Sequence, residues 1–337
     1  MNPFGIIGSG AYGTAIAHAL SLNPQNQSIF MWARNSDIVN EINSKNTNSK
    51  YLGETQLSVK ISALNNLDEL YQNCQSIIYA CPSSHFYTFI KENKTSIKQH
   101  QLINTAKGID PKSFLFHHEI IKRELGSSFL INNYFALSGP SFAKEIAAEN
   151  PTCVTLSGCV DKKTKELQSL MSHKNFRIYT LNDFIGLQLG GALKNVIAIA
   201  VGICEGLQLG FNAQSALINW DLKEITRLGL KMGGKPETFI GLSVIGDLIL
   251  TCTGSLSRNR QFGIHLGSGL SKNEAIKKVN STIEGINTSL ACHHVLKKNN
   301  IHLSILEETY KIIHEDKSPR EALETLLDKS LGPDWVN

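Results

Sequence analysis

A lone lysine, Lys194, stands in a long apolar segment and is the residue in this sequence best suited to exchanging a proton. Residues 186–204 are otherwise small or apolar, apart from Gln188 and Asn195. Burial of an ammonium group disfavours its charged form, so its pKa falls toward neutrality, where a lysine can act as a general acid or base. The alternative is a lysine whose methylene chain reaches from a core helix to water.

A carboxylate in a second apolar segment offers this lysine a partner. Asp247 is the charged residue of the otherwise apolar residues 241–250, and a buried carboxylate needs a partner or a function. The following loop carries hydroxyl and guanidinium groups, and its Ser257, Arg258 and Asn259 offer donors of the kind that bind a phosphate group. A solvated, charged turn is the alternative interpretation of that loop.

The N-terminal residues have the pattern of a dinucleotide-binding turn. A short apolar run from Phe4 leads to Gly8, Gly10 and Gly13, and a run of small and apolar residues follows. Such glycines make the tight turn, let a diphosphate approach the backbone and let the helix pack closely on the strand. The helix N-terminus then offers free N–H groups to the phosphates. A glycine-rich turn without function is the alternative.

The second predicted strand, residues 28–32, ends beside Arg34 and not beside an acidic residue. An acidic side chain at that place binds the ribose 2′-hydroxyl in sites that use NAD. A guanidinium group instead matches a 2′-phosphate in charge and geometry. We therefore predict that NADPH is preferred over NADH, with a solvated loop arginine as the alternative.

Later apolar runs predict further parallel strands with helices between them, at residues 76–80, 101–105, 134–137 and 153–156. Turn residues follow the first three of these runs. Because ligands of open α/β sheets bind beyond the carboxyl ends of strands, Pro82, Lys107, Gly139 and Ser141 are expected near one another and near the cofactor. An ordinary surface lysine is the alternative for Lys107.

Length and composition predict a soluble protein of two domains. The chain has 337 residues, of which 42% are hydrophobic and 18% charged, and its net charge of +4 is too weak to indicate a nucleic-acid partner. Strand-like patterns give way to helical periodicity after residue 179. We therefore predict an α/β Rossmann-type dinucleotide-binding domain at residues 1–180 and an all-α substrate-binding domain at residues 181–337.

The longest apolar segment, residues 184–204, has nearly the length of a membrane span. Gln188, Lys194 and Asn195 interrupt it, which favours a buried helix of a soluble core over stable membrane insertion. No basic segment of a signal peptide precedes the first apolar run, so a cytoplasmic protein is expected.

Neither the cysteines nor the histidines indicate a metal site. The seven cysteines are scattered and form no Cys-x-x-Cys pair, which predicts reduced thiols. Two pairs of histidines are adjacent, His117 with His118 and His293 with His294. Neighbouring residues on a helix point about 100° apart, and no carboxylate lies at ligand spacing, so no metal is predicted.

Seven segments together have the pattern of one known family. They are Gly-Ser-Gly-Ala-Tyr-Gly-Thr-Ala at 8–15, Ala-Lys-Gly-Ile at 106–109, Leu-Ser-Gly-Pro-Ser-Phe-Ala-Lys-Glu at 137–145, Gly-Gly-Ala-Leu-Lys-Asn at 190–195, Gly-Gly-Lys-Pro-Glu-Thr-Phe at 233–239, Gly-Asp-Leu-Ile-Leu-Thr-Cys-Thr at 246–253 and Ser-Arg-Asn-Arg-Gln-Phe-Gly at 257–263. These segments resemble bacterial glycerol-3-phosphate dehydrogenase, of the NAD-dependent glycerol-3-phosphate dehydrogenase family. The resemblance extends over about residues 4–330.

The resemblance implies reversible reduction of dihydroxyacetone phosphate to sn-glycerol 3-phosphate with NAD(P)H, which supplies the glycerol backbone of phospholipids in the cytoplasm. It also implies a homodimer, with Lys194 as the general acid or base at the carbinol oxygen. The residues that it implies for the substrate are Lys107, Gly139, Ser141, Lys194, Asp247, Ser257, Arg258 and Asn259. Those that it implies for the cofactor are Gly8, Gly10, Ala11, Tyr12, Gly13, Arg34, Lys107, Ala143, Arg258, Thr282 and Glu284.

The chain departs from the family pattern at three places. Ala11 and Tyr12 replace a common Ser-Trp pair, so position 11 lacks a hydroxyl group, and Thr282 replaces an apolar residue. Asn-Trp-Asp-Leu at residues 219–222 replaces Thr-Arg-Gly-Leu at a position of helix packing.

Two other functions are alternatives. One is a related two-domain dehydrogenase of the 3-hydroxy-acid or 6-phosphogluconate type, which would lack the segments around Asp247 and Arg258 together. The other is a non-catalytic NADPH-binding sensor, which would not need Lys194, Asp247 and Arg258.

Overall fold

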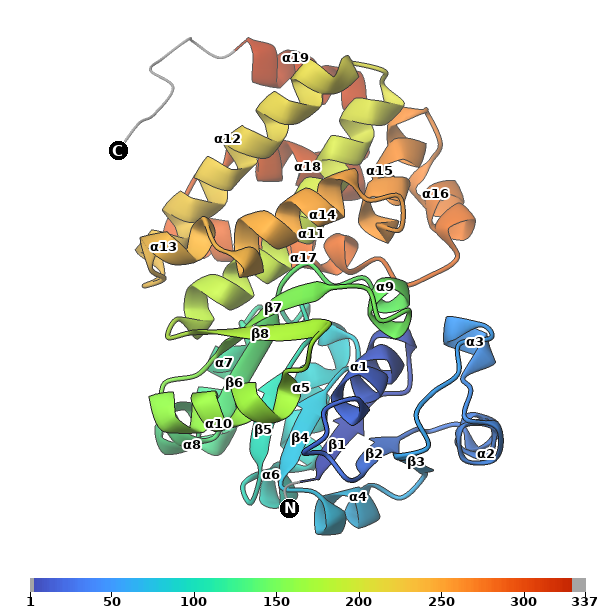
Figure 1. Ribbon diagram of the computed structural model, residues 1–337. Helices are drawn as coiled ribbons and strands as arrows, with labels where there is room; N and C mark the ends of the chain where they lie inside the picture. The colour runs from blue at the N-terminus through green and yellow to red at the C-terminus, as the bar shows by residue number, and fades with distance from the viewer. Residues whose placement is uncertain (1–2, 329–337) are drawn as a thin grey trace.

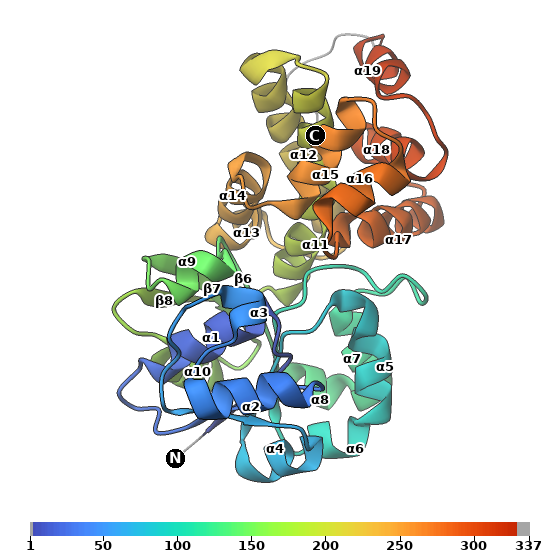
Figure 2. The ribbon, with the colours of Figure 1, turned by 90° about the vertical axis from the view of Figure 1, so that its right-hand side faces the viewer.

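The computed structural model describes residues 3–328 and consists of an α/β half followed by a helical half (Figure 1 and Figure 2). The part of the chain coloured blue to green forms the sheet and its helices, and the part coloured yellow to red forms the helices above it in Figure 1. The predicted fold class, a Rossmann-type α/β domain with an all-α partner, is confirmed.

Within the described residues, the α/β half is built on one eight-stranded sheet in the order β3-β2-β1-β4-β5-β6-β7-β8. The order reverses between β1 and β4, which is the point beyond whose carboxyl edge a doubly wound sheet binds its ligand. The strands are β1 (Phe4–Ile7), β2 (Ile29–Trp32), β3 (Ile61–Leu64), β4 (Ser76–Tyr79), β5 (Gln101–Asn104), β6 (Tyr134–Ser138), β7 (Thr152–Ser157) and β8 (Phe176–Leu181).

Helices cover both faces of the sheet, because its buried strands alternate between two apolar cores. Ile6 packs in one core and Ile7 in the other. The helices of this half are α1 (Ala11–Ser21), α2 (Ser36–Lys45), α3 (Ser49–Leu52), α4 (Leu67–Asn73), η1 (Ser83–His85), α5 (Phe86–Glu92), α6 (Lys94–Ile97), α7 (His117–Leu125), α8 (Ser127–Asn132), α9 (Ala143–Ala147) and α10 (Asp161–Met171).

The predicted direction of one strand is wrong. Residues 153–156 are predicted to continue the parallel sheet, but β7 pairs antiparallel with β6, with Leu137 opposite Leu156. A parallel pairing needs a connection that crosses the sheet. The connection here instead turns back at the carboxyl edge, where its short helix α9 packs against α1.

The helical half surrounds α11 (Phe184–Gly206), in which every residue from 186 to 204 is buried. A helix that is apolar all round belongs in a core, so the predicted buried helix is confirmed. The others are α12 (Gly210–Lys231), α13 (Pro236–Phe239), η2 (Leu242–Gly246), α14 (Asp247–Thr253), α15 (Arg258–Gly267), α16 (Lys272–Val279), α17 (Glu284–Asn299), α18 (Ser304–His314) and α19 (Pro319–Leu327).

Two helical stretches of the described residues have the length and apolar composition of a membrane span, Phe184–Gly206 and Pro236–Thr253. In the first, 89% of the apolar window is buried inside the protein. Its apolar surface is therefore already covered by the rest of the chain.

Helix α15 packs backbone to backbone on α11. A Cβ atom at Gly202 would lie 2.2 Å from the carbonyl oxygen of Arg260, and one at Gly263 would lie 2.1 Å from that of Ile199. Both positions therefore require glycine, since any side chain would push the helices apart. This contact fixes the first residues of α15 beside the middle of α11.

Helix α12 buries a carboxyl group without a partner. Asp221 is 0% exposed, and neither of its oxygens has a hydrogen-bond partner within the described part of the chain. Burial raises the pKa of Asp221 well above its usual value, and the neighbouring carboxylate of Glu224 raises it further. Asp221 lies in one of the segments that depart from the family pattern.

We expect Asp221→Asn to stabilise the protein increasingly as pH rises. The pKa of Asp221 is higher in the folded than in the unfolded chain. As pH rises from the lower to the higher of these pKa values, Asp221 ionises in the unfolded chain but not in the folded one, so the wild type loses stability. Asparagine cannot ionise. The Tm of the variant should match the wild type near pH 4 and exceed it by about 2 °C or more near pH 8. Thermal unfolding at both pH values measures this, and a Tm difference that does not grow with pH would contradict it.

Candidate active site

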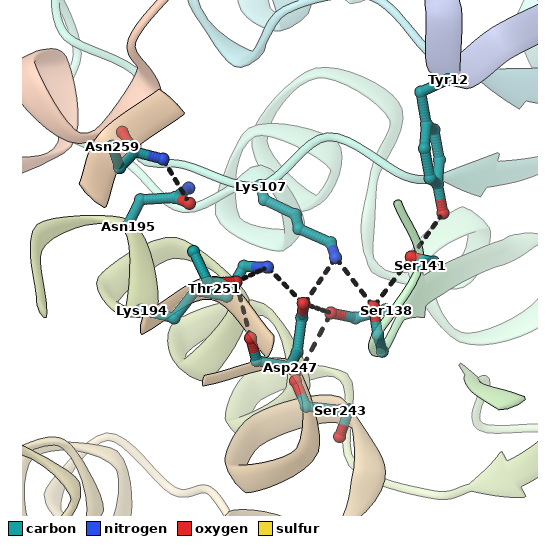
Figure 3. A network of polar contacts seen from close by, with 11 residues as sticks. Tyr12, Lys107, Ser138, Ser141, Lys194, Asn195, Ser243, Asp247, Thr251 and Asn259 are labelled. Carbon is teal, nitrogen blue, oxygen red and sulfur yellow. Dashed lines mark hydrogen bonds and ion pairs between the residues drawn. The ribbon is translucent and has the colours of Figure 1, made fainter. Parts of the chain in front are cut away.

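Lys194 lies in the middle of α11 and points at Asp247, the first residue of α14 (Figure 3). It forms an ion pair with Asp247 Oδ1, and its Nζ donates to Thr251 Oγ1 at 2.8 Å. Thr251 donates its own proton to the backbone carbonyl of Asp247 at 2.6 Å, so its oxygen is free to accept from the lysine. Lys194 is 6% exposed and Asp247 1%. The predicted pairing of the two is confirmed.

A second lysine shares the same carboxylate. Lys107, in the loop after β5, donates to Asp247 Oδ2 at 2.5 Å and to the carbonyl oxygen of Gly139 at 3.2 Å. The sequence places Lys107 near Gly139 but does not indicate its pairing with Asp247. Lys107 belongs to the α/β half and Asp247 to the helical half, so the carboxylate joins the two halves.

The buried charges determine the protonation state of Lys194. Burial lowers the pKa of Lys194 to about 7; Asp247 opposes this fall, and the ammonium of Lys107 adds to it. Burial alone would lower the pKa of Lys107, but Asp247, Tyr12 and Lys194 together outweigh it and raise that pKa. Burial would raise the pKa of Asp247, but the two lysines outweigh it and lower that pKa. At neutral pH, Lys107 and Asp247 are therefore charged while Lys194 can gain or lose a proton.

The first turn of α15 lies beside the residue that follows Lys194. Asn259 Nδ2 donates to Asn195 Oδ1 at 2.9 Å, and Asn259 Oδ1 accepts from the N–H of Gly285, in α17, at 3.0 Å. Asn259 therefore ties α15 to both α11 and α17. This places the loop residues predicted to bind phosphate within reach of the lysine cluster.

The start of α15 has the features of an anion site. Ser257 Oγ accepts from the N–H of Arg260 at 3.3 Å and so caps the helix. Arg258 is exposed and donates to Ser281 Oγ at 2.9 Å. A helix N-terminus with a guanidinium group beside it attracts a phosphate.

The glycine turn leaves room for a diphosphate. Gly8 has φ of +118°, and a Cβ atom at Gly13 would lie 2.0 Å from the Gly8 carbonyl oxygen, so both positions require glycine. A Cβ atom at Gly10 would meet nothing within 4 Å, and no side chain caps the start of α1, among the described residues. Asn48 supports the turn, since its Nδ2 donates to the carbonyl oxygen of Ser9 at 2.9 Å. These residues fit the phosphates of a dinucleotide.

Arg34 lies beside this turn. It follows β2, whose last residue, Trp32, accepts from the N–H of Gly8 at 3.3 Å. Arg34 is exposed and lies within electrostatic range of Cys81, whose Sγ approaches the glycine turn. The guanidinium is thus available to a group on the adenosine ribose of a dinucleotide.

Comparisons with known proteins match nearly the whole chain. The family model for the N-terminus of NAD-dependent glycerol-3-phosphate dehydrogenase matches residues 3–165, and the family model for its C-terminus matches residues 183–324. The glycerol-3-phosphate dehydrogenase [NAD(P)+] of Leptospira biflexa is 37% identical over 98% of this chain and 99% of its own. The chain belongs to the NAD-dependent glycerol-3-phosphate dehydrogenase family.

Further relatives agree with this assignment. The glycerol-3-phosphate dehydrogenase [NAD(P)+] of Myxococcus xanthus is 38% identical over 96% of this chain and 96% of its own. The crystal structure of glycerol-3-phosphate dehydrogenase from Coxiella burnetii matches with a TM-score of 0.90 at 35% identity, covering 97% of this chain and 99% of that one. The predicted resemblance is confirmed, and this member of the glycerol-3-phosphate dehydrogenase family is an NAD(P)-dependent oxidoreductase. The related dehydrogenase types are thereby excluded.

The other residues predicted for the cofactor lie at the edges of the same region of this dehydrogenase. Ala11 begins α1 and Ala143 begins α9, and both pack with Tyr12 on one core. Thr282 is exposed. Glu284, the first residue of α17, accepts from Ser83 Oγ at 3.2 Å and so forms a second polar contact between the halves.

The turn after β4 approaches the loop that carries Lys107. A Cβ atom at Gly108 would lie 2.2 Å from Ser83 Oγ, so the neighbouring Pro82 is close to that loop, as predicted. Burial raises the pKa of Glu284, and this effect is larger than the lowering by the hydrogen bonds that Glu284 accepts from Ser83.

Sequence reasoning missed five polar residues of this region, which are Ser83, Ser138, Asn195, Thr251 and Asn48. Thr251 could have been found, because it follows Asp247 by four residues and so shares its helix face. The others gave no pattern that distinguishes them from ordinary loop and strand-end residues.

Among residues 3–328, no three His, Cys, Asp or Glu side chains are arranged to hold a metal ion. The adjacent histidines have other contacts. His117 Nδ1 lies 2.9 Å from Asn104 Nδ2, and the His293 ring stacks on Tyr310 with the ring centroids 3.7 Å apart.

Proposed function

We propose that this protein reversibly reduces dihydroxyacetone phosphate to sn-glycerol 3-phosphate with NAD(P)H and so supplies phospholipid synthesis in the cytoplasm. The observation that carries the proposal is the buried pair of Lys194 and Asp247, between the glycine turn and the start of α15. Residues 1–180 would bind the dinucleotide and residues 181–337 the substrate. Residues 1–2 of the first range and residues 329–337 of the second range lie outside the described residues.

Lys194 would donate the proton of the reaction in one direction and accept it in the other. The nicotinamide supplies a hydride in one direction and accepts it in the other. As the ketone is reduced, Lys194 gives its proton to the oxygen on C2, and in the reverse direction it takes that proton back. A positioned proton donor contributes about 10²–10⁴-fold to the rate. Asp247 orients the lysine, and Lys107 holds the other carboxylate oxygen.

The start of α15 would bind the substrate phosphate. Arg258 supplies the charge, while Ser257 and Asn259 hold the helix N-terminus in place. Binding energy from the phosphate is thereby used to orient C2 toward the lysine and the cofactor. Gly139 and Ser141 would contact the substrate from the side of the α/β half.

This function is tested by measuring the absorbance of NADPH over time in a mixture of purified protein, NADPH and dihydroxyacetone phosphate. Oxidation that requires the phosphate, and is lost with unphosphorylated dihydroxyacetone, is the expected result. Binding of NADPH without oxidation would instead indicate a different substrate for this oxidoreductase. The reverse reaction with sn-glycerol 3-phosphate tests reversibility.

We also propose that NADPH is the preferred cofactor, with NADH as a weaker one. The position of Arg34 beside the glycine turn supports this preference. Arg34→Ala should raise KM for NADPH by about tenfold or more, because a charge-assisted hydrogen bond is lost, and leave KM for NADH unchanged. Steady-state kinetics with both cofactors measures this. Equal preference in the wild type would contradict the proposal.

A homodimer is the proposed assembly. Phe211 and Trp220 of α12 are 84% and 52% exposed, and Ile240, after α13, is 75% exposed. Burial of such large apolar side chains against a second copy would stabilise this assembly. Light scattering that gives the mass of a single chain would contradict this assembly.

A further inference from the structure

The hydroxyl of Tyr12 begins a chain of hydrogen bonds that ends at Lys194 (Figure 3). Ser141 Oγ has one proton, which it donates to the carbonyl oxygen of Gly139 at 2.8 Å. In its contact with Tyr12, at 3.4 Å, the phenol must therefore be the donor. The Gly139 carbonyl has a second lone pair, which accepts from Lys107 Nζ at 3.2 Å.

The direction of Lys107 depends on this chain. Its side-chain stem lies on α11, since a Cβ atom at Gly191 would be 3.7 Å from Lys107 Cγ. Its ammonium is shared between the Gly139 carbonyl and Asp247 Oδ2. Ser141 donates to the same carbonyl, so the orientation of Ser141 is coupled to the contact that Lys107 makes there.

We propose that Tyr12 is a positioning residue for this reaction: its hydroxyl orients Ser141 and thereby, through Gly139, fixes Lys107 against the carboxylate that holds the proton donor. The kinetic part of this inference rests on the proposed function, whereas the positioning of Lys107 does not. Because Tyr12 is the second residue of α1, the same side chain adjoins both the glycine turn and the lysine cluster.

The phenol is suited to this role over the neutral pH range. Burial raises the pKa of Tyr12, and the influence of Lys107 lowers it by less. The hydroxyl therefore keeps its proton and remains a donor. A Ser-Trp pair is common in the family at positions 11 and 12, so the phenol of Tyr12 departs from that pattern.

Tyr12→Phe tests the proposal because it removes the hydroxyl and keeps the ring. We expect kcat for reduction of dihydroxyacetone phosphate to fall about two- to tenfold, as for one lost hydrogen bond. KM for the substrate and Kd for NADPH, measured by fluorescence, should change by less than about twofold. Acetylation of Lys107 by acetic anhydride, followed by peptide mass spectrometry, should become about twofold faster or more, because a looser contact with Asp247 leaves more of the amine neutral and reactive.

Tyr71→Phe is the matched control. The Tyr71 hydroxyl is also buried in the α/β half, but it has no hydrogen-bond partner within the described residues. Its removal should leave kcat and the acetylation of Lys107 unchanged.

The outcomes separate this proposal from the proposed function. Wild-type kcat and wild-type acetylation of Lys107 in Tyr12→Phe would overturn it, as would a change confined to Kd for NADPH. If the wild type does not oxidise NADPH with dihydroxyacetone phosphate, the proposed function fails. Faster acetylation in Tyr12→Phe would still support the positioning role in that case, and equal acetylation would overturn it.

Discussion

Replacing Lys194 with methionine is expected to lower kcat for reduction of dihydroxyacetone phosphate by about 10²–10⁴-fold, while NADPH still binds. Methionine keeps most of the side-chain volume that α11 buries, but it cannot carry a proton. The glycine turn lies in the other half of the molecule, so cofactor binding is preserved. Steady-state kinetics and a fluorescence titration measure the two effects separately.

The pH dependence of the wild type checks the same role independently. Because burial lowers the pKa of Lys194 to about 7, the protonated donor needed for reduction is lost as pH rises through that value. The neutral amine needed for oxidation is lost as pH falls through it. The rates of the two directions should therefore change in opposite senses around pH 7.

Lys278→Met serves as the control for this prediction, since Lys278 is an exposed residue of α16. It should leave kcat and both pH profiles unchanged. Wild-type activity in Lys194→Met would show that another group transfers the proton. So would rates that change in the same sense with pH in both directions of the reaction.

Asp247→Asn is expected to lower the free energy of unfolding by about 3–5 kcal/mol and to remove most of the activity. The substitution removes the carboxylate that Lys107 and Lys194 share, and it leaves the partly buried charge of Lys107 without a carboxylate partner. The pKa of Lys194 should fall further, because Asp247 opposes the effect of burial. Denaturant unfolding and kcat measure the two losses.

An exposed ion pair provides the comparison for this effect. Asp161 and Lys165 lie 2.7 Å apart on the surface of α10, so Asp161→Asn should hardly change the stability. Adding Lys107→Met to Asp247→Asn should restore part of the loss, because the unpaired charge of Lys107 is removed. Full stability in Asp247→Asn alone would refute the buried pairing.

The sequence predicts those parts of the site that depend on local pattern. The change from a strand period to Gly8, Gly10 and Gly13 followed by a helix is contained in a few consecutive residues. Lys194 and Asp247 are each the charged residue of an apolar run, which predicts burial and therefore a partner. For these residues the structure agrees with the prediction.

Contacts between distant segments could not be predicted in the same way. Lys107 and Asp247 are 140 residues apart, and neither segment indicates that both lysines share a carboxylate. The direction of β7 depends on the packing of α9 against α1. The unpartnered carboxyl group of Asp221 likewise results from how α12 docks. Strand β3 was not predicted because its sequence, Ile-Ser-Ala-Leu, has the small residues Ser62 and Ala63 at its centre and so does not form an apolar run.

The glycine contact between α11 and α15 constrains how the molecule can move. No side chain separates Gly202 from the backbone of Arg260, or Gly263 from the backbone of Ile199. The two helix backbones are therefore in direct contact and cannot slide past each other. Lys194 and the first turn of α15 must therefore travel as one rigid body. The two halves meet at the lysine cluster through polar contacts such as Lys107 with Asp247, which water can replace. Elsewhere they meet through apolar contacts, since Leu187 packs in a core of the α/β half and Phe116 in the core of the helical half, and these contacts can serve as the hinge. Product release should consequently open the molecule like a hinge between its halves, carrying the proposed proton donor and the proposed phosphate site away from the glycine turn together.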